Sequence, residues 1–401
     1  MTGAQATNWT GAFARRTRTR GGDELTAILA GGRPGVLSMT GGFPNPATFP
    51  TDVLDDLAAR VLRDGAALQY TPVRGLPGPR AFLRDRLQAT DGRRPDEDEL
   101  MLTSGGMECI GLACSALLDP GDAVVVEAPT YLGALMAFGA AEAQVHGIGM
   151  DEDGLLVDEL AERLEAGLRP KLLYVIPDHQ NPTGRTLSRP RREALVELCR
   201  RHRLLVLEDV AYRELGFDGS TLPSLWSLGP DVVVQAGTFS KILMPGVRLG
   251  WAAGPAEVVA ELANAKQNTD QCAGAFGQVL MEAYGRAGHF EAPAPAARAL
   301  YAAHWAALGD ALERHMPAGA RWSRPSGGFF SWLALPEGLD AMGLRPAAED
   351  AGVAYVPGHP FYPGEAGGAA EMRLSFSHLR EDELAEAAKR LADVVRDAVS
   401  A

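Results

Sequence analysis

Short apolar runs, separated by helix-length segments such as SRPRREALVELCRRH (188–202), dominate the middle of the chain. Each run is rich in Val, Leu or Ile and lacks the strict alternation of a strand with one solvated face. Such runs alternating with helices predict a largely parallel sheet covered on both faces, an α/β domain over residues 46–285. The five predicted strands are ELMLTSGG (99–106), DAVVVEAP (122–129), KLLYVIPD (171–178), RLLVLEDV (203–210) and DVVVQAGT (231–238).

The pattern changes after about residue 286. A long Ala-rich helical segment (292–316) precedes two short apolar runs (327–336 and 371–379), and an amphipathic helical pattern (380–399) ends the chain. With 401 residues, the chain also exceeds the roughly 250–300 residues at which a single core stops growing. We therefore predict a smaller α+β domain over residues 286–401 that closes on the first domain.

Composition and charge narrow the possible partners. Lys and Arg number 38 and Asp and Glu 51, so the formal charge is 38 − 51 = −13, which disfavours a nucleic-acid partner. The N-terminus has no apolar signal region, and no apolar run approaches the roughly 20 residues that span a bilayer. The four cysteines lack zinc spacing and the chain has no HxxH or HxxxH pair. We expect a cytoplasmic protein without a metal site or a membrane partner.

Polar residues stand where several of the predicted strands end, and ligands of parallel sheets bind beyond the carboxyl ends of strands. The turn SGGME (104–108) opens a helix, and free N–H groups at a helix start suit a phosphate. Asn181 precedes a proline, and Asp209 and Tyr212 follow RLLVLE. Taken alone, the Ser-Gly-Gly turn is as typical of an ordinary turn as of a phosphate site, and an Asn-Pro turn is usually only a turn. A buried carboxylate such as Asp209, however, is costly unless a positive group faces it.

The segment GTFSKILMPGVRLGW places Lys241 among Thr238, Ser240 and Arg248. A flat, phosphorylated aldehyde cofactor explains this arrangement, because Arg248 can grip the phosphate bidentately together with the two hydroxyls. Lys241, beside another cation and partly desolvated, would then have a pKa below the usual value of about 10.4 and act as a nucleophile for Schiff-base chemistry. Asp209 would face a protonated pyridine nitrogen, a pair worth about 4 kcal/mol at ~4 Å and an effective dielectric near ~20.

Five motifs in this order resemble the fold-type I, class I/II pyridoxal phosphate aminotransferases, most closely the 2-aminoadipate and kynurenine aminotransferase-like subgroup. They are SGGME, QNPTG, EDVAYREL, TFSKILMPGVRLGW and MRLSFSHL. The spacing also matches the family, with 28 residues from Asn181 to Asp209 and 32 from Asp209 to Lys241. The resemblance extends from GGFPNPATFP to the last helix and implies the fold of a fold-type I pyridoxal phosphate-dependent transferase.

The resemblance implies a role for each matching residue. Lys241 becomes the Schiff-base lysine, Asp209 the partner of the pyridine nitrogen, and Arg373 the binder of the substrate α-carboxylate. Tyr70 resembles the tyrosine that reaches the phosphate of the neighbouring subunit, which implies a homodimer with shared active sites. Gly42 lies close to the substrate on an N-terminal segment (1–45) that closes over the site and joins the small domain. The other implied cofactor contacts are Asn181 and Tyr212 to the ring oxygen, Tyr131 on the ring face, and Gly106, Met107, Thr238, Ser240 and Arg248 around the phosphate.

The implied activity is the transfer of an amino group between an L-amino acid and a 2-keto acid by double displacement, with Lys241 as the general base. The chain departs from the subgroup at three places, one of which is NTDQCAGAF (268–276), where a pattern of small residues and Pro is more usual. Gly106 and Met107 stand where a Ser-Gln pair is expected, which removes side-chain contacts to the phosphate. Asp23 stands where an arginine often reads a distal carboxylate, so Asp23 either faces a cationic substrate group or is an ordinary residue of a first helical turn.

Two other functions use the same residues. A pyridoxal phosphate enzyme of elimination, substitution or ring formation, acting on an amino acid with a sulfonium or ammonium side chain, shares the same early steps. A non-catalytic regulator is the other alternative, because related domains occur fused to DNA-binding modules. The acidic charge of the chain disfavours this second alternative.

Overall fold

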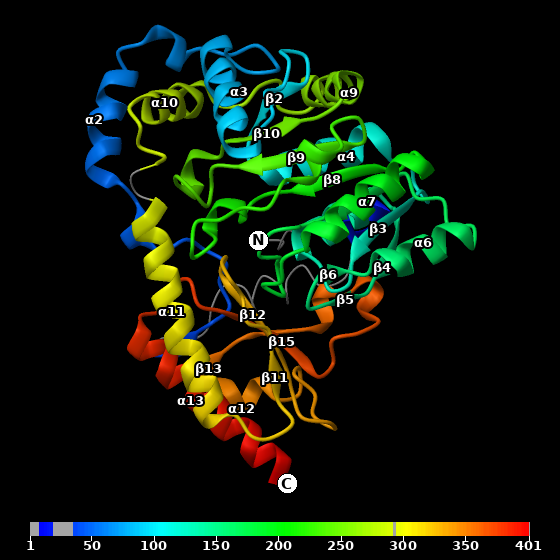
Figure 1. Cartoon of the computed structure of the whole chain (residues 1–401), viewed down its shortest axis with the longest axis vertical. Helices are drawn as coiled ribbons and strands as arrows, with labels where there is room; N and C mark the ends of the chain where they lie inside the picture. The colour runs from blue at the N-terminus through cyan, green and yellow to red at the C-terminus, as the bar shows by residue number, and fades with distance from the viewer. Residues whose placement is uncertain (1–7, 19–34, 292–293, 401) are drawn as a thin grey trace, which may run out of the picture.

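A seven-stranded sheet forms the centre of the molecule. The computed structural model describes residues 8–18, 35–291 and 294–400. In Figure 1 the sheet, coloured cyan to green, lies apart from the orange strands of the C-terminal part. In their order across the sheet, the strands are β2 (Leu100–Thr103), β10 (Gly250–Ala253), β9 (Val233–Thr238), β8 (Leu205–Asp209), β7 (Leu172–Val175), β3 (Ala123–Glu127) and β4 (Gln144–Ile148).

The largely parallel sheet confirms the fold prediction. Strands β9, β8, β7, β3 and β4 pair in parallel, whereas β10 pairs antiparallel with both β9 and β2. All five predicted strands are present, and the prediction missed β4 and β10. Strand β10 reads GWAA and lacks Val, Leu and Ile, while β4 is a partly exposed edge strand that contains His146 and Gly147. Neither has the run of Val, Leu or Ile by which the five other strands were predicted.

Helices bury both faces of this sheet. Val124 and Val126 of β3 belong to one hydrophobic cluster together with Ile110, whereas Val125 between them belongs to another together with Leu195. Alternate residues of a strand point to opposite faces, so both faces of β3 are buried against hydrophobic residues. The helices of this part are α2 (Thr51–Val61), α3 (Pro77–Asp91), α4 (Gly106–Leu117), α5 (Leu132–Ala140), α6 (Val157–Glu165), α7 (Arg189–His202), α8 (Leu225–Leu228), α9 (Ala256–Gln267) and α10 (Ala275–Arg286).

The C-terminal part is built on a four-stranded sheet, in the order β11 (Arg321–Trp322), β12 (Phe330–Ala334), β15 (Glu371–Ser375) and β14 (Val356–Pro357). The helices α11 (Ala294–His315) and α13 (Glu381–Ser400) pack on each other, and α12 (Arg345–Asp350) completes this part. Two short pairs remain, the hairpin of β5 (Met150–Asp151) with β6 (Gly154–Leu155), and the parallel pair of β1 (Leu37–Ser38) with β13 (Val353–Ala354). The domain boundaries near residues 45 and 285 stay a prediction.

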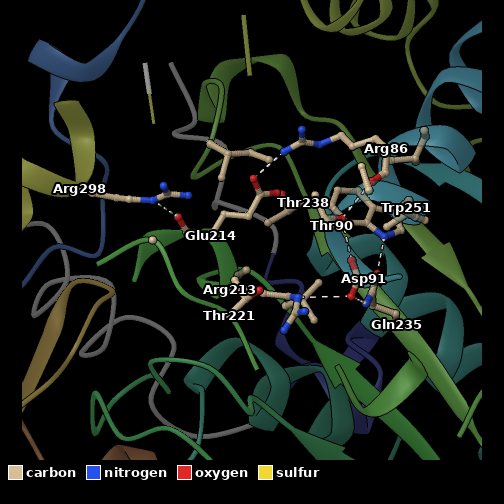
Figure 2. Close-up of a pocket in the computed structure, with 17 residues that line it drawn as sticks. Arg86, Thr90, Asp91, Arg213, Glu214, Thr221, Gln235, Thr238, Trp251 and Arg298 are labelled. Carbon is tan, nitrogen blue, oxygen red and sulfur yellow. Dashed lines mark hydrogen bonds and ion pairs between the residues drawn. The ribbon is translucent and has the colours of Figure 1, made fainter. Parts of the chain in front are cut away.

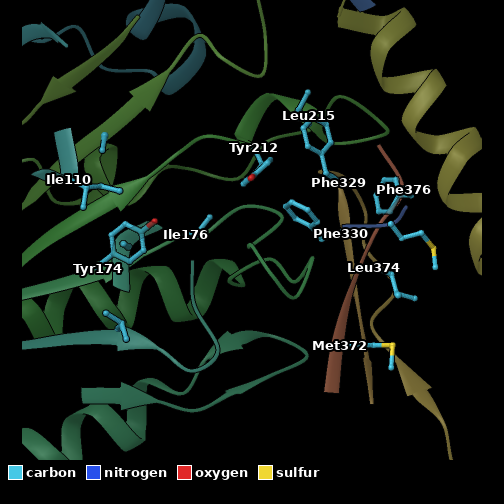
Figure 3. Packing of buried hydrophobic residues seen from close by; sticks show 14 of the residues in the cluster. Ile110, Tyr174, Ile176, Tyr212, Leu215, Phe329, Phe330, Met372, Leu374 and Phe376 are labelled. Atoms are coloured by element: carbon cyan, nitrogen blue, oxygen red, sulfur yellow. The ribbon is translucent and has the colours of Figure 1, made fainter. Parts of the chain in front are cut away.

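An aromatic contact joins the two sheets. Tyr212, which follows β8, packs edge-on against Phe329 and Phe330, with ring centroids 5.6 and 5.8 Å apart. Figure 3 shows these rings between residues of the large sheet, such as Tyr174, and residues of β15, such as Leu374. The hydrophobic core is therefore continuous across the two parts, so the walls of the space between them are rigidly packed.

Close packing on β9 gives a test of this architecture. A Cβ at Gly237 would lie 1.9 Å from Cε2 of Trp251 on the neighbouring strand. Gly237→Ala should therefore lower the free energy of unfolding by about 1–3 kcal/mol through overpacking. The matched control is Gly111→Ala inside α4, where a Cβ has nothing within 4 Å. Because Ala favours a helix over Gly, this control should stabilise by about 0.5–1 kcal/mol. Urea denaturation of both variants measures the difference, and equal effects would contradict the packing.

Candidate active site

A cavity of about 320 Å³ opens at the carboxyl ends of the parallel strands. The structure brings twelve of the residues singled out in the sequence to its lining. They are Gly42, Gly106, Met107, Tyr131, Asn181, Asp209, Tyr212, Thr238, Ser240, Lys241, Arg248 and Arg373. Tyr70 is not among the lining residues, and Asp23 lies outside the described residues.

Lys241 follows β9, and its amine points into the cavity. Its Nζ donates a hydrogen bond to the carbonyl oxygen of Gly42 at 2.8 Å and lies 5.7 Å from the ring centroid of Phe329. The pKa of Lys241 is lowered to about 8, mainly by burial; Asp209 opposes this shift, and the cations Arg373 and Arg248 add to it. A large fraction of this amine is therefore unprotonated near pH 8, as a nucleophile or a base requires.

Asp209 ends β8 and is buried. Tyr174 on β7 donates its hydroxyl to Oδ2 of Asp209 at 2.8 Å, and the backbone N–H of Ala211 donates to Oδ1 at 3.1 Å. Burial raises the pKa of Asp209, and the bond from Tyr174 opposes that rise. The sequence reasoning missed Tyr174 because a tyrosine inside an apolar run reads as a core residue. Its position in KLLYVIPD, a strand that pairs in parallel with RLLVLED, is the sequence feature that could have indicated a contact with Asp209.

Arg373 on β15 carries a buried guanidinium with a free donor. Its Nη1 donates to Oδ1 of Asn181 at 2.9 Å and its Nη2 to the carbonyl oxygen of Thr40 at 2.5 Å. The guanidinium lies over the ring of Phe330, with Cζ 4.3 Å from the centroid. Its buried Nε has no hydrogen-bond partner. Burial lowers the pKa of Arg373 to about 10. An anionic group in the cavity would satisfy this donor, because buried polar groups are almost always hydrogen-bonded.

The turn between β2 and α4 forms a cradle with Arg248. Gly105 has φ +99°, and a Cβ there would lie 2.9 Å from Nη2 of Arg248, so only glycine fits. The helix start at Gly106 presents backbone N–H groups. Across the cradle, the hydroxyl of Thr238 donates to that of Ser240 at 2.9 Å. No ion pair of Arg248 is found in the described part of the chain, so its charge is available for an anion.

Comparison with known proteins identifies this arrangement. The family aminotransferase class I and II matches residues 44–391 of the chain. The chain belongs to this family. It is 36% identical, over 90% of its length and 88% of the relative's, to aromatic-amino-acid aminotransferase 1 of Thermococcus litoralis.

The aminotransferase is also similar to two solved structures. Kynurenine aminotransferase of Pyrococcus horikoshii, in complex with PMP, has a TM-score of 0.92 and 37% identity over 97% of this chain and 98% of the other. The α-aminoadipate aminotransferase of Thermus thermophilus, complexed with N-(5'-phosphopyridoxyl)-L-leucine, has a TM-score of 0.90 and 35% identity over 98% and 100%.

These findings confirm the fold, the family and the activity expected from the sequence: the protein is a pyridoxal phosphate-dependent aminotransferase of fold type I. The site fits the cofactor on its own evidence. A Cβ at Gly105 would meet Nη2 of Arg248, so the glycine allows this guanidinium to lie against the turn, and Arg248 has no carboxylate partner among the described residues. The described residues hold no cluster of His, Cys, Asp or Glu arranged for a metal ion. Within the same residues, no helix is long and apolar enough to cross a membrane.

A second cavity, of about 210 Å³, adjoins the active site of the aminotransferase and shares Thr238 and Ala211 with it. Figure 2 shows the residues that line this second cavity. Ion pairs fill its walls. Nη2 of Arg86 lies 2.5 Å from Glu214, and Nε of Arg213 lies 3.3 Å from Asp91. These pairs connect α3 to the segment after β8, and so they fix the chain on which Asp209 and Tyr212 stand. The sequence reasoning did not identify them, because charged residues on a helix usually face solvent.

The pKa of Lys241 can be measured directly. Competitive labelling of the cofactor-free protein with trace acetic anhydride, read by mass spectrometry of peptides, should give a midpoint near pH 8 for Lys241. Below that pH the amine is protonated and unreactive, and above it the amine is free. Lys171 is the internal comparison, because its hydrogen bond with Asp122 raises its pKa above the usual 10.5. A midpoint at or above 10 for Lys241 would contradict the electrostatic account of the cavity.

Proposed function

We propose that the aminotransferase passes the amino group of an L-amino acid to a 2-keto acid in two half-reactions, with Arg373 binding the α-carboxylate of both substrates. The observation that carries this proposal is the buried guanidinium of Arg373, whose Nε lacks a hydrogen-bond partner and which lines the same cavity as the amine of Lys241. A carboxylate held there brings the α-carbon of a substrate close to the base. Charge-assisted bonds of this kind contribute about 1.5–3 kcal/mol each.

Lys241 is the group that we propose to hold the cofactor and to move the α-proton. Pyridoxal phosphate, when bound, supplies the electron sink that makes loss of this proton possible. The pKa of Lys241 is lowered to about 8, so at slightly alkaline pH about half or more of the amine is uncharged and can accept the proton. The hydrogen bond to the carbonyl of Gly42 orients Nζ inside the cavity. The lysine therefore combines a suitable pKa with a fixed position.

The remaining lining residues would hold the cofactor. We propose that Asp209 pairs with the pyridine nitrogen, because it is the one carboxylate among the described residues that line the cavity. Tyr174 and the N–H of Ala211 keep its two oxygens in place. Asn181 and Tyr212 would donate to the ring oxygen and Tyr131 would cover the ring face. The proposed phosphate contacts are the backbone N–H groups of Gly106 and Met107, the hydroxyls of Thr238 and Ser240, and the guanidinium of Arg248.

Amino transfer is favoured over elimination, substitution or ring formation, because the similar proteins named above are aminotransferases. For the amino donor, the proposal specifies only an L-amino acid. The role of Asp23 as a partner of a cationic side chain stays a prediction and lies outside the described residues. A strong preference for 2-aminoadipate over cationic amino acids would contradict that role.

The proposed reaction is tested by its half-reactions. Purified holoenzyme mixed with single L-amino acids should lose its visible absorbance and form one 2-keto acid per aminated cofactor. A 2-keto acid should then restore the absorbance. Arg373→Lys should raise KM for both substrates about 10- to 100-fold, because the planar, bidentate donor is lost. Arg324→Lys, at an exposed position of the same C-terminal part, should leave KM unchanged. Release of ammonia without amination of the cofactor would favour an elimination enzyme instead.

We further propose that two copies of the chain form a homodimer in which Tyr70 reaches the phosphate of the partner. Tyr70 is 83% exposed, and Leu62 and Leu68 before it are also largely exposed. At the cavity mouth, Phe43 is 60% exposed. Exposed apolar side chains of this kind support covering by a second copy. The four unpaired cysteines support the expected cytoplasmic location.

Complementation between two inactive variants tests the shared site. Lys241→Ala and Tyr70→Ala are each expected to lose most activity. If Tyr70 serves the partner's site, a mixed dimer contains one site with both native residues, so unfolding and refolding the variants together should restore about a quarter of the native activity. Sedimentation measures the dimer in the same samples. If dimers form but no activity is restored, Tyr70 contributes to the active site of its own chain and not to that of the partner.

A further inference from the structure

A buried ammonium supports the turn that precedes α4. Lys266, in the last turn of α9, has no exposed surface. Its Nζ lies 2.7 Å from both carboxylate oxygens of Glu108, and 2.7 and 2.9 Å from those of Asp270. Burying a charged group costs free energy that only well-formed ion pairs and hydrogen bonds offset. Four short contacts to two carboxylates meet this condition.

Both carboxylates also hold the same residue of the turn. Oε2 of Glu108 accepts the backbone N–H of Ser104 at 2.6 Å, and Oδ2 of Asp270 accepts the hydroxyl of Ser104 at 2.8 Å. The carbonyl oxygen of Ser104 in turn accepts Nη2 of Arg248 at 3.4 Å. Every polar group of Ser104 is therefore bonded on one side to the ion cluster or on the other to the cavity arginine. Ser104 links Lys266 to the cradle.

The cradle depends on backbone direction more than on side chains. Gly105, Gly106 and Met107 carry no hydroxyl or amide side chain, so their N–H groups are the donors that this turn offers an anion. An N–H is fixed in space only if the peptide that carries it is fixed, and glycine, present at position 105, is the most flexible residue type. Hydrogen bonds weaken steeply when donors turn away from the acceptor. A rigid anchor at Ser104 keeps these donors aimed at the cavity.

We propose that Lys266, acting through Glu108 and Asp270, is a positioning residue that fixes the Ser104–Gly106 turn for the phosphate of the cofactor. The inference rests on the proposed placement of the phosphate at this turn. Direct attraction between Lys266 and the phosphate does not account for the arrangement. The cluster contains one ammonium and two carboxylates, so with both carboxylates ionised its net charge is 1 − 2 = −1, which repels an anion. Its contribution is geometric.

The aminated cofactor provides the test, because no bond to Lys241 retains it and its release reports non-covalent binding. Lys266→Met keeps the length of the side chain and removes the charge. In PMP-loaded holoenzyme, this change should raise the dissociation constant of PMP at least tenfold in equilibrium dialysis. The ³¹P resonance of the bound cofactor should also move toward that of free PMP. Lys389→Met, which removes one exposed lysine of α13, is the matched control and should change neither quantity.

Three outcomes decide the inference. A folded Lys266→Met protein that retains PMP within twofold of wild type, with an unchanged ³¹P resonance, overturns it. If Lys266→Met does not fold, Glu108→Gln and Asp270→Asn replace it; each should raise the dissociation constant about threefold or more, and no change in either overturns the inference. Arg248→Met distinguishes a wrong positioning role for Lys266 from a wrong placement of the phosphate. If PMP retention survives Arg248→Met, the placement itself is wrong; if it falls there but not in the cluster variants, only the positioning role is wrong.

Discussion

The active site depends on an excess of positive charge in a partly buried cavity. Among the described lining residues, Lys241, Arg248 and Arg373 face a single carboxylate, Asp209. Burial takes these cations out of water, and the lowered pKa values of Lys241 and Arg373 express this cost, to which the two arginines add at Lys241. A ligand that carries a phosphate and a carboxylate relieves it. The same electrostatic imbalance therefore accounts for a reactive lysine and for selection of anionic ligands.

Much of this site was predictable because its residues stand at strand ends. Asn181, Asp209 and Thr238 each end or follow a strand of the parallel sheet, and the carboxyl ends of parallel strands meet at one edge. The positions of these residues in the sequence are therefore enough to predict that their side chains converge. Arg373 was different. It lies in the middle of a strand of another sheet, and only the resemblance to the family connected it to the cavity.

The residues that escaped prediction act through partners distant in the sequence. Tyr174 reads as part of an apolar strand, and only the register of β7 on β8 brings its hydroxyl to Asp209. Lys266 reads as an ordinary helix residue, and its burial depends on how α9 packs against α4. Hydrophobic periodicity indicates which face of an element is buried, but it does not indicate which polar group of a neighbouring element contacts that face. Such contacts are visible only in three dimensions.

The segment around β1 ties the beginning of the chain to its end. The N–H of Met39 donates to the carbonyl of Ala354, the carbonyl of Met39 accepts the N–H of Ser375, and the carbonyl of Thr40 accepts a hydrogen bond from Arg373. Gly42, three residues after Met39, supplies the carbonyl that holds the amine of Lys241. During synthesis on the ribosome, the large sheet has all its strands long before residues 353–375 emerge. The lysine thus receives its final surroundings only when translation is nearly finished, and a nascent or C-terminally truncated chain lacks them.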